Sequence, residues 1–200
     1  MIDEHVDRKK ISINILVSCL LFFLITGCGS AKEDVSTLTF DKDGHILEYL
    51  VEDFPADSYD VSEWEDEVRK GMDAYNKSGK GTITLSDVEF KDDKLKCMVD
   101  YDTDDAYFYL NNEPLFYGTV SQAVKAGYSM TVPVFDTKSG DELPPVRLKD
   151  MSESNVIIIG RPIQIKTHKK IRYASGSVHV EHDLKSAVIE GEDTAYIVFD

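Results

Sequence analysis

The sequence predicts an α+β fold, with antiparallel β-sheet and two or three helices packed on one face. Short runs in which apolar and polar residues alternate are separated by Gly, Pro and Asp turn signals, which is typical of antiparallel strands. The segment 61–75 instead repeats its apolar residues every three or four positions, as a helix does. From position 156 onward the pattern is almost entirely that of short strands. Segregation of helices from most strands favours α+β over an alternating α/β order.

The first elements are two strands, Leu38–Phe40 and Ile46–Phe54, joined by the tight turn Asp41-Lys42-Asp43-Gly44. Asp-Gly between two alternating runs is a strong hairpin signal. In the second strand one face carries Leu47, Tyr49 and Val51, and the other carries Glu48 and Glu52.

A helix is predicted after Ser58–Asp60. Either Asp60 with Glu63 or Ser62 with Glu65 supplies a capping box, and Gly79 is a suitable end. The residues expected on its buried face are Val61, Trp64, Val68, Met72 and Tyr75.

A second hairpin follows, formed by Thr82–Leu85, Val88–Phe90 and Leu95–Tyr101. The apolar parity changes near Ser86-Asp87, which indicates a β-bulge. Cys97 shares a face with apolar neighbours, so we interpret it as a buried structural thiol.

A further helix is predicted over Ala106–Leu110, beginning at Thr103 or Asp104. After Leu115–Gly118 a short helix is capped by Thr119 with Gln122 and closed by Gly127, and Lys138–Asp150 is expected to be a loop. The late strands are predicted at Val156–Ile159, Ile163–Lys166, Ile171–Ala174, Val178–Glu181, Ala187–Ile189 and Thr194–Phe199.

The amino-terminal stretch predicts export. An apolar run, Ile11–Cys28, follows the basic residues Arg8-Lys9-Lys10 and ends in Ile25-Thr26-Gly27-Cys28. A basic region, an apolar region and small residues before a cleavage point are typical of a signal peptide. A retained membrane span needs at least about 18 apolar residues, and the run from Ile11 to Ile25 is shorter and contains polar residues. An uncleaved anchor or a plain cleaved signal remains the alternative.

This ending resembles the lipobox of bacterial lipoproteins. The order of the later segments is similar to that of uncharacterised surface lipoproteins of low-GC Gram-positive bacteria. These segments are DKDG, VEDFPADSYDVSEWEDEV, LFYGTVSQAVKAGY and PIQIKTHKKIRYAS. The resemblance implies a diacylglyceryl group on Cys28, cleavage between Gly27 and Cys28, and location on the outer face of the cell membrane. It implies no catalytic residues.

Cleavage there leaves 173 residues: a tether at 28–37, then one domain at 38–200 with a subdivision conceivable near 138–150. The net charge of −15 excludes nucleic acid as a favoured partner. With Cys19 removed and Cys28 lipidated, Cys97 has no thiol left to pair with inside the chain.

Three patterns are candidates for a metal site. The acids of Asp100–Asp105 are spaced like the start of a calcium loop, but the sixth position is Asp105 instead of Gly and the twelfth is Asn111 instead of Glu. Asp41-Lys42-Asp43-Gly44 fails as well, because its first position is Thr39 and its twelfth is Leu50. His179 and His182 are expected on opposite faces of a strand, which separates them as ligands. We therefore expect no metal and no cofactor.

No nucleophile motif, phosphate-binding loop or zinc motif is present, so we expect no enzymatic activity. Two surfaces favour binding. One is the basic cluster Lys166, His168, Lys169, Lys170 and Arg172, and the other is the aromatic group Tyr101, Tyr107, Phe108, Tyr109, Phe116, Tyr117 and Tyr128. The prediction is a lipid-anchored, non-catalytic binding module for a protein, peptide or glycan near the membrane. An envelope hydrolase and a structural subunit of an envelope complex are the alternatives.

Overall fold

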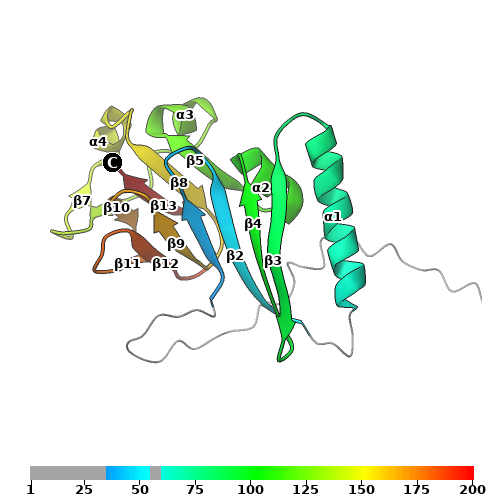
Figure 1. Cartoon of the computed structure of the whole chain (residues 1–200). Helices are drawn as coiled ribbons and strands as arrows, with labels where there is room; N and C mark the ends of the chain where they lie inside the picture. Colours follow the sequence, from blue (N-terminus) through cyan, green and yellow to red (C-terminus); the bar gives the residue numbers. More distant parts are fainter. Residues whose placement is uncertain (1–34, 55–59) are drawn as a thin grey trace, which may run out of the picture.

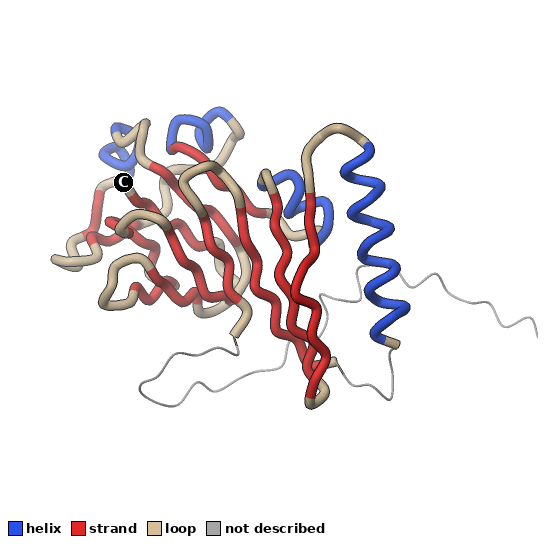
Figure 2. Tube along the Cα trace, viewed as in Figure 1, coloured by secondary structure: helices blue, strands red, loops and turns tan. Residues whose placement is uncertain are grey.

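The computed structural model describes residues 35–54 and 60–200. Within them lie two β-sheets and four helices, an α+β fold as predicted (Figures 1 and 2). The strands are β1 (Thr37–Phe40), β2 (Ile46–Asp53), β3 (Ile83–Lys91), β4 (Lys94–Tyr101), β5 (Leu115–Thr119), β6 (Val134–Asp136), β7 (Glu142–Leu143), β8 (Asn155–Ile159), β9 (Ile163–Thr167), β10 (Ile171–Ser175), β11 (Val178–Val180), β12 (Ser186–Ile189) and β13 (Ala195–Phe199). The helices are α1 (Val61–Lys77), α2 (Asp104–Asn111), α3 (Val120–Lys125) and α4 (Pro145–Asp150).

The seven-stranded sheet, sheet A, has the order β11-β12-β9-β1-β2-β4-β3, and the six-stranded sheet, sheet B, has the order β5-β8-β13-β10-β6-β7. Their pairs are antiparallel except for β1 and β9, which run parallel with Thr37 opposite Gln164. This pair joins the first hairpin to the carboxyl-terminal strands, a long-range contact that periodicity cannot reveal.

The main apolar core lies between the inner face of sheet A and one face of sheet B. Ile157, Ile197 and Phe199 of sheet B share it with Leu38 and Phe40 of sheet A. At the β2-β4-β3 end of sheet A, the helices α1 and α2 cover this inner face in place of sheet B (Figure 1). The junction between sheet B and these two helices is where the candidate site lies.

A second core covers the opposite face of sheet B. Val156, Ile158 and Val198 pack there with Val120 of α3 and Leu148 of α4. Because β8 and β13 are buried on both faces, their sequences are continuously apolar and do not alternate.

Local signals explain the helix ends. The Asp60 side chain caps α1 by accepting hydrogen bonds from the backbone N–H groups of Ser62 and Glu63, so of the two predicted starts it is Asp60 that caps the helix. Thr103 caps α2, and Thr119 with Gln122 forms the predicted capping box of α3. The predicted bulge is also confirmed, because the β3–β4 register shifts between Ser86 and Glu89.

Other expectations need correction. The predicted loop Lys138–Asp150 contains β7 and the helix α4, which has Pro145 at its first position and buries Leu148 against sheet B. Proline at the start of a short helix is favourable, and a composition-based argument mistakes it for a loop signal. The expected tether ran to residue 37, yet Thr37 begins β1, and Ser36 exchanges hydrogen bonds with the backbone of Val51.

Two further expectations concern the membrane. No helix among residues 35–54 and 60–200 has the length and apolar character needed to cross a membrane. The predicted signal peptide, the predicted cleavage and lipidation site at Gly27 and Cys28, and Ser58 before the first helix all lie outside the described residues.

Candidate functional site

A buried glutamate organises the candidate site. Glu48 lies in the middle of β2 with 2% of its surface exposed, on the inner face of sheet A between Ile46 and Leu50. The alternation predicted for this strand is present, but the face that turns to the core is the one that carries Glu48 and Glu52. Leu47, Tyr49 and Val51 lie on the outer face and are half-buried.

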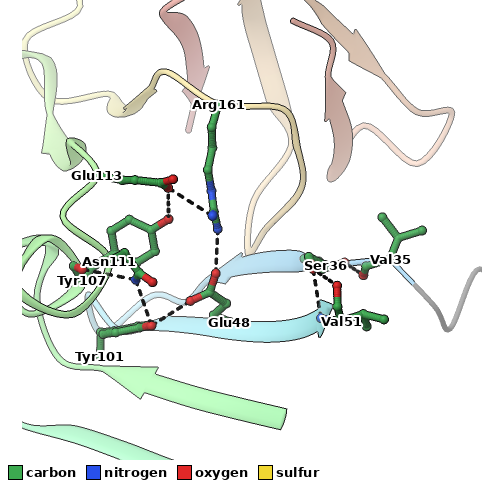
Figure 3. A network of polar contacts seen from close by, with 10 residues as sticks. Val35, Ser36, Glu48, Val51, Tyr101, Tyr107, Asn111, Glu113 and Arg161 are labelled. Atoms are coloured by element: carbon green, nitrogen blue, oxygen red, sulfur yellow. Dashed lines mark hydrogen bonds and ion pairs between the residues drawn. The ribbon is translucent and has the colours of Figure 1, made fainter. Parts of the chain in front are cut away.

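Arg161 neutralises Glu48. It lies in the turn between β8 of sheet B and β9 of sheet A, and its Nη2 is 2.6 Å from Glu48 Oε1 (Figure 3). Its Nη1 also lies 3.1 Å from Glu113 Oε2, so one guanidinium bridges two carboxylates. The guanidinium is 5.7 Å from the ring centroid of Tyr107, whose hydroxyl donates to Glu113 at 3.3 Å. Burial opposes the charge of Arg161, but Tyr107, Glu48 and Glu113 raise its pKa above the ordinary value.

Two polar side chains complete the network. The Tyr101 hydroxyl donates to Glu48 Oε2 at 2.7 Å, and Asn111 Nδ2 donates to the Tyr101 oxygen at 3.0 Å (Figure 3). Burial and the adjacent Glu48 carboxylate raise the pKa of Tyr101 well above its usual value, so the hydroxyl stays protonated and remains a donor. The network ties β2 and β4 to α2 and to the β8–β9 turn.

A cavity of about 70 Å³ opens beside this network, between sheet A and the helices α1 and α2. The lining combines polar and apolar side chains. The polar lining consists of Glu48, Glu52, Tyr101, Asn111, Glu113 and Arg161, and the apolar lining of Leu50, Trp64, Val68, Leu85, Cys97, Val99 and Leu110. The cavity has room for a few water molecules or for a group the size of one side chain.

Two groups in the cavity wall lack partners. The Glu52 carboxyl makes no hydrogen bond or ion pair with any residue in the described part of the chain, although it is half-buried. Burial raises the pKa of Glu52, and the nearby charges of Glu48 and Glu113 add to the effect, while Arg161 opposes it. The indole Nε1 of Trp64 is buried and has no acceptor among residues 35–54 and 60–200. A buried donor left unsatisfied in this way costs free energy, so Trp64 points to an occupant.

The arrangement is suited to binding a small polar group. Glu48 and Glu113 are held by Arg161 and by tyrosine hydroxyls, which leaves Glu52 as the carboxyl free to contact a ligand. No set of three or more His, Cys, Asp or Glu side chains within the described ranges could hold a metal ion.

Acidic side chains of the segment Asp100–Asp105 form hydrogen bonds and an ion pair within the fold. Asp100 pairs with His45 at 3.0 Å across the sheet, and Asp102 accepts the backbone N–H of Thr82 at 2.7 Å. Asp104 accepts the N–H of Tyr117, and Thr103 caps α2. The hydrogen bond with Asp100 raises the pKa of His45, with smaller contributions from Asp41 and Asp102.

The other predicted clusters are dispersed. His179 lies on β11 and His182 in the following turn, both exposed. In the basic cluster, Arg172 pairs with Asp200 at 3.2 Å, while His168 packs edge-on against Phe199. The cationic groups of Lys166, Lys169 and Lys170 belong to exposed side chains.

The aromatic group divides between core and surface. Tyr101, Tyr107 and Phe116 are buried, whereas Phe108 and Tyr109 of α2 are 48% and 49% exposed. Cys97 is buried as predicted, with 1% of its surface exposed, and burial raises the pKa of its thiol to about 12. It also lines the cavity.

Sequence reasoning missed the central pair. Arg161 stands in the sequence Gly160-Arg161-Pro162, which by itself indicates only a turn, and the alternation places Glu48 only on the polar face of a strand. The available signal was weak: Glu48 sits between the apolar Ile46 and Leu50 on one face, where an acid needs a partner if that face is buried.

The chain was compared with known protein families, with curated proteins and with solved structures, and none of the three comparisons finds a match, so the function has to be argued from this site alone.

Proposed function

We propose that this protein is a lipid-anchored, extracytoplasmic binding module without catalytic activity, and that its ligand occupies the cavity between sheet A, α1 and α2. The observation that carries the proposal is the cavity wall, in which the Glu52 carboxyl and the Trp64 indole nitrogen have no partner among residues 35–54 and 60–200. Both groups line the same cavity as the ionic network of Glu48, Arg161 and Glu113. A concave site that combines apolar lining with oriented polar groups is typical of ligand binding.

The geometry favours binding over catalysis. Glycoside hydrolysis, the reaction most often associated with paired acids, needs two carboxyl groups that act on the substrate. Here Arg161 engages two of the three carboxylates that line the cavity, Glu48 and Glu113. A volume of about 70 Å³ also leaves little room for a substrate together with an attacking water.

An envelope hydrolase is the second candidate, and one observation favours it. The raised pKa of Glu52, inside a cavity, is the property expected of a general acid. The two candidates differ in the fate of the ligand. A binding module releases its ligand chemically unchanged. A hydrolase cleaves the ligand, and the variant Glu52→Gln would then lose the cleavage activity.

The binding proposal is tested by photo-crosslinking in intact cells. A photoreactive benzoylphenylalanine replaces Val68, which lines the cavity. In a matched control it replaces Val146, which is 65% exposed and belongs to α4, the helix that packs on the opposite face of sheet B. We expect an adduct at position 68 and not at position 146, identified by mass spectrometry as protein, peptide or glycan. No adduct at either position, or equal adducts at both, would contradict the proposal. Incubation of the identified ligand with the wild-type chain then separates module from hydrolase.

The lipid anchor is tested separately. Membrane attachment through a diacylglyceryl group on Cys28 predicts that Cys28→Ala leaves the protein unprocessed or releases it into the medium. Fractionation of cells that express the variant measures this, with Cys19→Ala as the control within the same apolar stretch. Unchanged membrane association with normal processing would argue against lipidation.

A further inference from the structure

The charges that line the cavity do not balance. Glu48, Glu52 and Glu113 contribute three carboxyl groups, and Arg161 is the one cationic side chain among the lining residues. When these groups are ionised the wall carries an excess of two negative charges. The excess is concentrated at Glu52, because Arg161 is already bonded to Glu48 at 2.6 Å and to Glu113 at 3.1 Å. An occupant with a positive charge would therefore be attracted to Glu52.

Apolar side chains from both sides of the cavity favour an apolar stem. Leu50, Leu85 and Val99 line the cavity from the sheet, and Val68 and Leu110 line it from the helices. A fully polar cation such as a hydrated metal ion would leave this surface in contact with water. An alkyl chain would cover it and would gain free energy in proportion to the apolar area removed from water.

The unpartnered donors require an acceptor, and the neighbouring carboxyl groups disfavour a negatively charged one. The Trp64 Nε1 and the Arg161 Nε are buried and donate to nothing in residues 35–54 and 60–200. An anion could accept from them, but it would lie beside three carboxyl groups and only one guanidinium. A neutral carbonyl oxygen satisfies a donor without this repulsion.

We propose that the cavity receives the side chain of a lysine from a partner peptide, with its ammonium group at Glu52, its methylene stem on the apolar wall and a peptide carbonyl near the Trp64 indole. Lysine combines a compact charge with a flexible four-carbon stem, which fits a narrow cavity better than the broad guanidinium of arginine. The net charge of −15 attracts a basic peptide from a distance. This inference rests on the proposed binding function and specifies its ligand.

The chain provides its own reporter. Trp64 is its one tryptophan, and because it lines the cavity, its fluorescence responds to occupation there. The full-length chain in detergent is titrated with N-acetyl-lysinamide and with N-acetyl-norleucinamide, a ligand that keeps the alkyl stem and the carbonyl groups but lacks the ammonium. We expect the lysine amide to bind at least about tenfold more tightly, the preference that one half-buried charge pair supplies.

A pair of variants separates the site from the general acidity of the surface. Glu52→Gln is expected to reduce binding of the lysine amide to the level of the norleucine amide and to leave the norleucine amide unaffected. Glu67→Gln removes the same charge from the exposed face of α1, where it lines no part of this cavity, and should leave both affinities unchanged. Glu52→Gln does not threaten folding, because it removes a carboxyl whose ionisation the folded state opposes.

The outcomes distinguish this inference from the proposed function. Equal binding of the two amides, or equal effects of the two variants, overturns the lysine inference and leaves a cavity that still binds ligands. A lack of any fluorescence response to either amide also overturns it, and the adduct at position 68 then decides separately whether the cavity is a binding site. An adduct that contains no basic side chain contradicts the inference in the cell.

Discussion

Arg161→Met tests the central network most directly. The substitution keeps an unbranched apolar stem but removes the charge that neutralises Glu48, which is 2% exposed and lies 2.6 Å from the guanidinium. Breaking a buried ion pair by removing one partner costs about 3–5 kcal/mol, because the other charge remains buried. Arg161 is itself 24% exposed and Tyr101 still donates to Glu48, so we expect the lower end, a loss of about 3 kcal/mol in the free energy of unfolding.

The assay is urea unfolding followed by the fluorescence of Trp64. Arg69→Met is the matched control, since Arg69 also pairs with a glutamate, Glu65, at 2.7 Å, but on the exposed surface of α1. An exposed pair of this kind contributes about 0.3–0.5 kcal/mol. The double variant Glu48→Gln with Arg161→Met should recover most of the loss, because the most deeply buried carboxylate is then neutral. If Arg161→Met costs no more than Arg69→Met, the claim that the Glu48 carboxylate is buried and dependent on Arg161 is wrong.

Three further predictions follow from the same structure. Because burial raises the pKa of Glu52, the contribution of this residue to the stability of the fold is greatest at acid pH and falls as pH rises through the raised pKa. Glu52→Gln should therefore raise the melting temperature of the protein at pH 7 and lose this advantage near pH 4. Equal melting temperatures of variant and wild type at pH 7 would refute this prediction. The Asp100 hydrogen bond raises the pKa of His45, so NMR titration should place it above about 6.5, and Asp100→Asn should lower it. The His45–Asp100 pair stabilises the fold fully below the ordinary histidine pKa, and this stabilisation disappears as pH rises through the raised pKa of His45. If Asp100→Asn left the titration of His45 unchanged, the contact between the two side chains would be excluded. Thiol labelling at Cys97 should be slow in the folded chain and fast in urea, as measured on the peptide that contains it; fast native labelling would contradict its burial.

Several elements could be predicted from the sequence because their causes are local. The Asp60 and Thr119 caps, the bulge near Asp87 and the period of α1 each depend on residues within a few positions of one another. The helix α4 was missed because its short sequence, with Pro145 at the start, has too few residues to show a period.

The candidate site could not be predicted in the same way. Glu48 and Arg161 are 113 residues apart in the chain, and they meet because β1 pairs in parallel with β9 and so places the β8–β9 turn above β2. No local pattern encodes that pairing. In the folded chain the face of β2 that carries Glu48 is turned to the core. A glutamate can occupy this buried position because Arg161 lies beside it.

The sequence by itself determined what short-range chemistry determines: where the strands and most helices begin and end, that Cys97 is buried, and that the chain is strongly acidic. The tertiary structure alone decided which face of β2 is the core, which of three glutamates are neutralised, and where a cavity remains. The physical reason is that the free energy of a buried charge depends on what surrounds it in space, and strand pairing brings those surroundings together from distant parts of the chain.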